Sequence, residues 1–179
     1  MTVLGVEGRE QIRARALASV RAQVGIDLTD VRIIEDVAPA SWSRKDVCRR
    51  RNDLLSRVET PWTATLDDDD WWLPWHLQML WRRLAAFPGV AAVIPRGVCH
   101  GGREGEDYFT LSAGLIDVAA LWSVGGWIYA PGCHVDYITA YVLSASYPVH
   151  HLRDRATWVH EVGGHRQMVG ASRRQELAL

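Results

Sequence analysis

The first hundred residues alternate between short apolar runs and longer segments in which apolar residues recur every three or four positions. The runs are rich in β-branched and aromatic residues, which favours strands, whereas the longer segments have the spacing of helices with one buried face. The predicted strands cover residues 2–6, 31–36, 62–66 and 90–94, and the predicted helices cover residues 8–23, 43–58 and 74–87. This alternation over short connections predicts an α/β fold with a mainly parallel central sheet.

Each of these three helices carries an apolar stripe that we expect to face the sheet. The stripes are Ile12, Ala16, Val20 and Val24 in the first helix, Val47, Leu54, Leu55 and Val58 in the second, and Leu77, Leu80, Trp81 and Leu84 in the third. Ser43 precedes Asp46 by the spacing of a capping box, which places the start of the second helix there.

After Pro95 the pattern is less regular. Residues 101–107 are polar and rich in glycine, which is typical of a loop. The later predicted elements are a strand at 108–116, a short helix at 118–123, a helix at 134–144 and a last strand at 147–152. Asp117 is expected to cap the short helix, and little regular structure is expected from Arg153 onward. The expected buried face of the longer helix is Val135, Ile138, Tyr141 and Val142.

Four consecutive carboxylates, Asp67 to Asp70, stand where the third predicted strand ends. Two unit charges about 4 Å apart near a protein surface repel by roughly 4 kcal/mol, so this run needs a cation, a helix N-terminus or open water. Side chains alternate along an extended backbone, which lets Asp67 and Asp69 point the same way and suits a hard divalent cation such as Mg²⁺ or Mn²⁺. Asp70 is expected to cap the following helix. The alternative is a solvated turn without a ligand.

Composition places the chain among ordinary globular proteins. Its 179 residues are 48% hydrophobic and 23% charged with a net charge of -1, which suits one domain and argues against bulk nucleic acid or an anionic membrane as partner. No apolar run reaches the roughly 20 residues needed to cross a bilayer, and the N-terminus lacks the layout of a signal peptide. Three widely spaced cysteines indicate reduced thiols, so a cytoplasmic location is expected.

Several segments occur in the order that is typical of one enzyme family. They are Ala16–Gln23, Ile33–Asp36, Arg51–Asn52, Leu66–Trp71, Leu115–Trp127 and Asp136–Tyr137. Together they resemble family 2 glycosyltransferases of the GT-A fold. In that family a helix ending in Ser-x-x-x-Gln precedes an Ile-Val-Asp-Asp strand, and an Arg-Asn helix and a Leu-Asp-x-Asp-Asp-Trp metal motif follow. The likeness extends over about residues 2–165.

The resemblance implies a GT-A-type, Rossmann-like three-layer sandwich that transfers a sugar from a nucleotide-diphosphate sugar, with uridine as the expected nucleoside. It implies Mn²⁺ or Mg²⁺ held by Asp67 and Asp69 with help from His160, and metal-dependent transfer by a single inverting displacement. Asp136 matches the general base that deprotonates the acceptor hydroxyl. Asp36 matches the acid that contacts the nucleoside. The donor-binding residues that the resemblance implies are Asp36, Arg51, Asp67, Asp68 and Trp127.

The chain departs from the family pattern at the end expected to bind the base. Val6-Glu7-Gly8-Arg9 stands where the family has a Pro-x-Tyr-Asn turn, and Glu35-Asp36-Val37-Ala38 replaces Asp-Asp-Gly-Ser. A nucleotide-binding module of the same fold, inactive as a transferase and acting as scaffold or regulator, is therefore an alternative. A sugar nucleotidyltransferase is disfavoured, because no glycine-rich N-terminal loop precedes an arginine that could cradle a triphosphate.

We expect a single domain over residues 1–179. Its nucleotide-binding half is expected at about 1–100, its acceptor and catalytic half at about 101–165, and a frayed tail at 166–179. The acceptor stays open between a saccharide, a lipid-linked glycan, a protein and a modified nucleic acid. A homo-oligomer also stays open, because a second copy could complete the acceptor site of a short domain.

Overall fold

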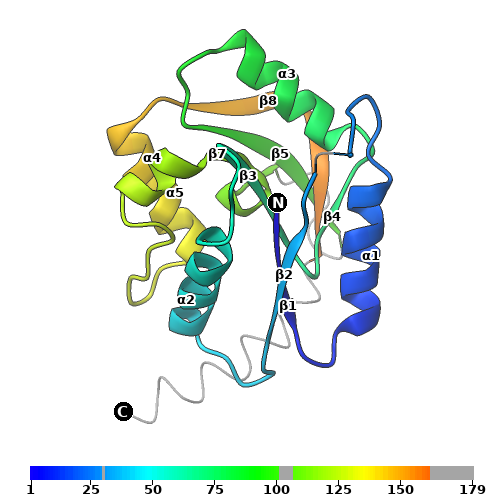
Figure 1. The fold of residues 1–179 in the computed structure, drawn as a ribbon, viewed down its shortest axis with the longest axis vertical. Coiled ribbons are helices and arrows are strands. Elements are labelled where there is room, and N and C mark those ends of the chain that lie inside the picture. The colour runs from blue at the N-terminus through cyan, green and yellow to red at the C-terminus, as the bar shows by residue number, and fades with distance from the viewer. Residues whose placement is uncertain (30, 101–106, 162–179) are drawn as a thin grey trace.

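The computed structural model describes residues 1–29, 31–100 and 107–161, whose strands join in one mixed sheet (Figure 1). The strands are β1 (Thr2–Val6), β2 (Ile34–Ala38), β3 (Trp62–Asp67), β4 (Trp71–Trp72), β5 (Ala92–His100), β6 (Asp107–Phe109), β7 (Leu115–Asp117) and β8 (Val149–Glu161). The helices are α1 (Glu10–Arg21), α2 (Arg44–Leu55), α3 (His76–Ala86), α4 (Val118–Ser123), α5 (Val135–Ser146) and the 3₁₀ turn η1 (Leu111–Ala113). Most of the predicted loop at 101–107 and the whole predicted tail at 166–179 lie outside the described residues.

The sheet has the strand order β2-β1-β3-β7-β5-β8-β4, with β6 paired to β5 beside this path. Its two longest ladders, β5 with β8 and β1 with β2, are parallel, and so is β1 with β3. Strand β7 runs antiparallel between β3 and β5 and thereby joins the two parallel parts. The predicted fold class is confirmed, while the antiparallel pairings of β4, β6 and β7 were not predicted.

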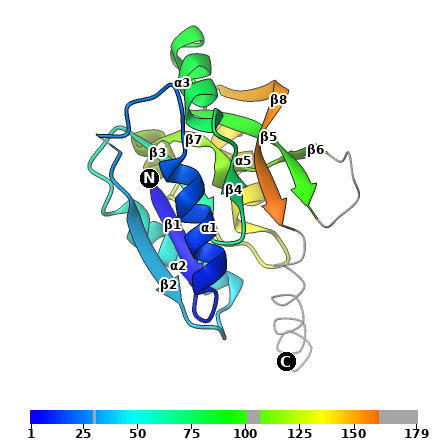
Figure 2. The ribbon, with the colours of Figure 1, turned by 90° about the vertical axis from the view of Figure 1, so that its right-hand side faces the viewer.

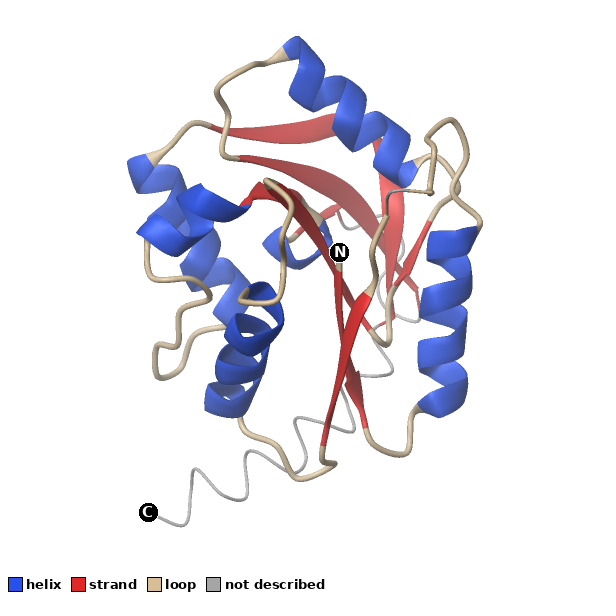
Figure 3. Ribbon diagram, viewed as in Figure 1, coloured by secondary structure: helices blue, strands red, loops and turns tan. Residues whose placement is uncertain are grey.

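Helices cover both faces of the sheet, which gives the three layers expected (Figures 2 and 3). On one face α1 and α3 bury Val20 and Leu80 in a core that also contains residues of the sheet. On the other face α2, α4 and α5 bury Leu55, Leu121 and Leu143. Among the helices that the structure describes, none has both the length and the apolar character needed to cross a membrane.

Strand β5 extends beyond the run predicted at 90–94. Pro95 lies inside it, at a point where the register with β8 shifts between residues 95 and 97, and such irregularities accommodate a residue without a backbone N–H. Gly97 follows, and a Cβ at this position would lie 2.3 Å from the ring of Trp158. Strand β5 therefore continues past Pro95 because the register with β8 shifts there and because Gly97 leaves room for the ring of Trp158.

Strand β8 continues to Glu161, whereas the pattern predicted a strand only at 147–152 and little structure beyond it. The prediction was wrong for residues 153–161. The exposed stretch 153–155 consists of three charged residues and interrupts the apolar pattern. Burial resumes from Thr157, where the chain pairs with both β4 and β5.

The single strand predicted at 108–116 is replaced by β6, η1 and β7. The hydroxyl of Thr110 accepts a hydrogen bond of 3.3 Å from the N–H of Ser112, and this contact begins the 3₁₀ turn. The N–H of Gly114 then bonds to the carbonyl of Leu111 at 2.9 Å and closes the turn. Local side-chain bonding of this kind competes with strand pairing, and the apolar pattern alone does not show it.

Two of the three predicted helix caps, Ser43 and Asp117, are confirmed. The side chain of Ser43 accepts a hydrogen bond from the N–H of Asp46, and the carboxylate of Asp46 accepts one from the N–H of Ser43, which completes the capping box of α2. Asp117 accepts a hydrogen bond of 2.8 Å from the N–H of Ala120 at the start of α4.

The predicted buried faces of the helices are correct near their centres and wrong at some flanking positions. Ile12 and Val24 are exposed because they lie in the first turn of α1 and beyond its end. Trp81 and Tyr141 are exposed because each lies beside the buried stripe, which in α5 runs through Val135, Thr139 and Leu143.

His76 begins α3 with none of its surface exposed. Its Nδ1 lies 2.9 Å from the hydroxyl of Thr157, and its ring stacks on Trp72 with 4.4 Å between centroids. Burial lowers the pKa of His76 to about 3, so the ring is neutral in the folded protein at every pH above that value.

We expect His76 to make the protein sensitive to acid. Between pH 6.5 and 3 the unfolded state binds the additional proton, so this group removes stability as the pH falls, by about 2 kcal/mol at pH 5. The free energy of unfolding, measured with urea, should therefore change less between pH 7 and pH 5 in His76→Gln than in wild type. An equal change in both proteins would contradict the burial of a neutral histidine here.

Candidate active site

The acid run lies at the carboxyl end of β3. Asp67 is the last residue of that strand, and Asp68, Asp69 and Asp70 form the turn that leads into β4. Asp67 keeps 31% of its side chain exposed, whereas the other three side chains are at most 5% exposed. Carboxylates buried to this extent need counter-charges, and the protein itself supplies them.

Arg9 neutralises the two middle carboxylates. Its Nη1 donates to Asp68 Oδ1 at 2.8 Å, and its Nη2 donates to Asp69 Oδ2 at 3.0 Å. Asp68 also accepts a hydrogen bond of 2.8 Å from the N–H of Val6, which ties the end of β1 to the acid run. Because the side chain of Arg9 is only 9% exposed, these contacts form a buried, hydrogen-bonded ion pair.

Arg51 neutralises Asp67 from α2. Its Nη2 donates to both carboxylate oxygens, at 2.6 and 2.9 Å. The guanidinium carbon lies 4.6 Å from the centre of the Trp127 ring, and Asn52 holds the backbone of Trp127 through two hydrogen bonds. Trp127 is only 2% exposed, so its ring supports Arg51, and its predicted contact with a donor stays a prediction.

Asp70 contacts β8 and not the following helix. Its Oδ1 lies 3.0 Å from Nδ1 of His160 and accepts a hydrogen bond of 3.2 Å from the N–H of Glu161. The prediction that Asp70 caps the helix was wrong, because β4 intervenes and α3 begins only at His76. His160, which the resemblance placed at the metal or diphosphate, is thus brought to the acid run.

Asp136, the predicted general base, is half-buried in the first turn of α5. The hydroxyl of Thr110 donates a hydrogen bond to its Oδ2. Arg51 experiences the charge of Asp136 together with the charges of Asp67 and Asp70. The fold therefore brings acids from two distant parts of the chain, residues 67–70 and Asp136, near one guanidinium group.

Asp36 stands at the same level of the sheet as Asp67. Leu4 of β1 is in register with Asp36 on one side and with Asp67 on the other, so the two acids lie two strands apart, roughly 10 Å. Arg50 Nη1 donates to Asp36 Oδ2 at 2.6 Å, and the Asp36 side chain keeps 30% of its surface exposed. Asp36 is therefore accessible beside the acid run, as a nucleoside contact requires.

Burial limits the negative charge of the run. It raises the pKa of Asp68 to about 7, although the charge of Arg9 opposes the shift, and it raises the pKa of Asp70 against the hydrogen bond and charge of His160. Burial lowers the pKa of His160, but the hydrogen bond and charge of Asp70 outweigh it, so the net shift is upward. Burial alone would also lower the pKa of Arg51, which the surrounding acids raise above its ordinary value.

The donor atoms of the run do not fit the predicted metal site. A hard divalent cation takes several oxygen ligands, but both oxygens of Asp67 accept from Arg51, and Asp69 is paired with Arg9. Within the described ranges, no three side chains of His, Cys, Asp or Glu are grouped so that they could hold a metal ion. A cation at Asp67, Asp69 and His160 would first have to displace an arginine.

Arg15 belongs to the site and was not predicted. Its guanidinium lies 4.0 Å from the centre of the Trp71 ring, and its Nη2 donates to the carbonyl of Asp69 at 3.2 Å. Arg15, Ser19 and Gln23 recur every four residues, and all three bond to the segment 69–77. This polar spacing along one side of the helix was the signal that could have identified Arg15.

Arg9 and Thr110 were also missed as site residues. Arg9 lies in the turn after β1, where the sequence departs from the family pattern, and Thr110 lay inside a wrongly predicted strand. No local spacing indicated the direction of either side chain. Their partners Asp68 and Asp136 are distant in sequence, so only the folded chain reveals both contacts.

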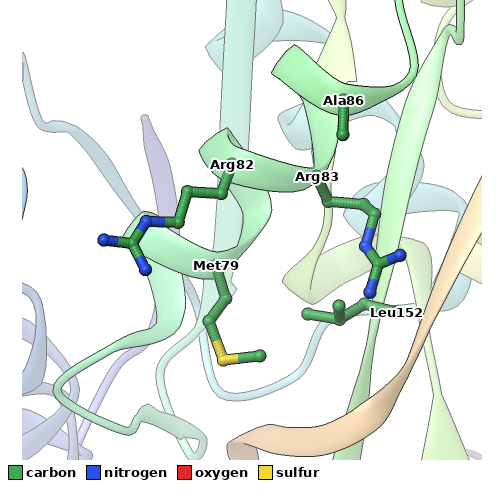
Figure 4. Close-up of a pocket in the computed structure, with 5 residues that line it drawn as sticks. All are labelled: Met79, Arg82, Arg83, Ala86 and Leu152. Carbon is green, nitrogen blue, oxygen red and sulfur yellow. The ribbon is translucent and has the colours of Figure 1, made fainter.

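A surface pocket lies elsewhere, against α3 and β8 (Figure 4). Its lining consists of Met79, Arg82, Arg83, Ala86 and Leu152. It contains none of the acids or arginines described above, so the candidate site is defined by its charged groups and not by this hollow.

No protein-family model matches the chain, and no curated protein matches it. Solved structures are similar to it. S. aureus TarS 1-349 in complex with UDP gives a TM-score of 0.65 at 14% identity, over 90% of this chain and 60% of that chain. The complex of the same protein with UDP-GlcNAc gives 0.66 at 12% identity, over 89% of this chain and 57% of that chain.

A mannosyltransferase is similar as well. PcManGT from Pyrobaculum calidifontis, in complex with GDP-Man and Mn²⁺, gives a TM-score of 0.57 at 16% identity, over 89% of this chain and 56% of that chain. The chain thus spans 60% or less of the length of each of these three structures. At these identities the likeness establishes the fold, and this chain has the α/β fold of these glycosyltransferase structures.

Proposed function

We propose that this chain transfers a sugar from a nucleotide-diphosphate sugar to an acceptor hydroxyl. The observation that carries the proposal is the grouping of Asp67 and Asp136 around Arg51 at the carboxyl end of β3, where open α/β sheets bind ligands. The similar solved structures add support, because TarS was solved with UDP and with UDP-GlcNAc, and PcManGT with GDP-Man. Uridine is the nucleoside that we propose, with Asp36 as its contact.

Asp136 acts as the general base in this proposal. Thr110 occupies Oδ2, so Oδ1 takes the proton of the acceptor hydroxyl while the hydroxyl oxygen attacks the anomeric carbon. The bond between that carbon and the diphosphate oxygen breaks, and its electron pair leaves with the diphosphate. This single displacement inverts the configuration of the sugar. No step uses the predicted Mn²⁺ or Mg²⁺, because Arg9 and Arg51 bind the carboxylates that would hold it.

Nucleotide binding provides the first test. UDP and UDP-GlcNAc should raise the melting temperature, because a ligand that binds only the folded state stabilises it by about 2.7 kcal/mol at 100 times Kd. For a chain of this size that corresponds to roughly 5–10 °C. GDP and GDP-mannose serve as parallel probes of the base. A complete absence of stabilisation by any of these nucleotides would refute the proposal.

Turnover separates the transferase from the inactive module. Release of UDP from UDP-GlcNAc, with water or simple saccharides as acceptors, should be detectable and should depend on Asp136. The anomeric configuration of the product, read by proton NMR, should be opposite to that of the donor. Binding without any turnover over a broad acceptor panel would favour the non-catalytic nucleotide-binding module instead.

A further inference from the structure

We propose that this site holds the donor diphosphate on arginine side chains and needs no divalent cation, with Arg15 as the residue that contacts the diphosphate. The inference rests on the proposed function, because it concerns how the same site binds the same donor. Three observations support it: the pairing of Arg9 with the acids, the buried, unpaired N–H donors of two arginines, and the exposed position of Arg15 beside the acid run.

The guanidinium of Arg9 lies among the acids and binds Asp69, one of the predicted metal ligands. It bridges Asp68 and Asp69 at 2.8 and 3.0 Å, and all three side chains are at most 9% exposed. A planar guanidinium satisfies two carboxylates at once and keeps its charge at every relevant pH. A divalent cation placed at Asp69 would lie beside this positive charge and would be repelled by it.

Buried polar atoms without a partner indicate which kind of ligand a site lacks. At this site those atoms are Arg50 Nε and Arg51 Nε, both of which are N–H donors. Arg50 and Arg51 are also the partners of Asp36 and Asp67. Unpaired N–H donors next to these acids favour an anion rather than a cation as the ligand of the site.

Arg15 supplies an exposed positive charge at the rim of the acid run. Its side chain is 43% exposed, and it is held by the Trp71 ring and by the carbonyl of Asp69. Its contacts with Glu161 are 3.4 Å long and exposed, so that ion pair is weak. A diphosphate can replace it with shorter, charge-assisted hydrogen bonds to the guanidinium fork.

The first experiment separates diphosphate binding from cation binding. The melting temperature of the full chain is measured with UDP and with UDP-GlcNAc, each in EDTA and each in MnCl₂, and we expect the same rise in both. Calorimetric titration with MnCl₂ alone should show no saturable binding. A rise that requires Mn²⁺ would overturn this inference and leave the proposed function standing. No rise under either condition would overturn both.

The second experiment tests the contact itself. Loss of one charge-assisted contact in Arg15→Ala should weaken UDP binding in EDTA about tenfold to a hundredfold, and Arg15→Lys should lie between Arg15→Ala and wild type. Arg21→Ala is the matched control, because Arg21 is exposed in the last turn of the same helix, and it should bind UDP like wild type. Equal affinities in Arg15→Ala and Arg21→Ala would overturn the assignment of Arg15.

Discussion

Replacing Arg51 by methionine is expected to lower the free energy of unfolding by about 3 kcal/mol and the melting temperature by roughly 6–12 °C. Methionine keeps an apolar stem against Trp127 but removes the charge that Asp67, Asp70 and Asp136 share. Breaking a buried ion pair costs about 3–5 kcal/mol, because the remaining charge is left uncompensated. Asp67 retains 31% exposure, so water relieves part of its charge and the lower end of that range applies.

Arg49→Met is the matched control for this prediction. It makes the same change two positions earlier on α2, but the Arg49 side chain is 61% exposed, and its ion pairs within the described residues are with Asp46 and Asp53, at 3.8 and 3.6 Å. Exposed pairs of this kind contribute about 0–1 kcal/mol. Thermal and urea unfolding that gave the same stability for both variants would show that the acids do not depend on Arg51.

A second variant separates lost charge from lost packing. Adding Asp67→Asn to Arg51→Met removes the carboxylate that has lost its partner, so part of the stability should return. If the loss arose only from packing against Trp127, the added change would restore nothing. The double-mutant cycle therefore measures the coupling between Arg51 and Asp67 directly.

The order of the longer strands and helices in the first hundred residues was predictable because each of them has a local sequence pattern. The capping box at Ser43 and the apolar runs of β1 and β3 need no knowledge of the rest of the chain. The short antiparallel strands are different. β4 has only two residues. It forms because Trp72 pairs with Trp158 of β8 and because the N–H of Trp72 donates to the hydroxyl of Ser19. No pattern within two residues can predict such partners.

The acids of the candidate site could be predicted from the sequence, but the side chains that pair with them could not. A run of four carboxylates requires positive charge, but a divalent cation and a pair of arginines meet that requirement equally well. Which of the two is present depends on the turn after β1, since that turn aims Arg9 at Asp68 and Asp69. The sequence of this turn differs from the corresponding turn of the glycosyltransferase family that the chain resembles. The difference indicated an altered site but did not show where the side chain of Arg9 points.

Asp136→Asn is expected to lower kcat for sugar transfer by a factor of about 10²–10⁴ while leaving UDP binding nearly unchanged. Asparagine has the same size and can still accept the hydrogen bond from Thr110, but its amide cannot take the proton of the acceptor. The measurement is the initial rate of UDP release in the presence of an acceptor, together with the affinity for UDP in its absence. The melting temperature should stay close to that of wild type, because Asp136 is only half-buried.

Thr110→Val distinguishes a base from a residue that only shapes the site. This change removes the hydroxyl that positions Asp136 but leaves the carboxylate in place, so kcat should fall less than in Asp136→Asn and the KM for the donor should change little. A structural role for Asp136 would instead lower both stability and donor affinity in Asp136→Asn. If Asp136→Asn retained transfer within about threefold of wild type, another group would have to take the proton, and Asp136 would not be the general base.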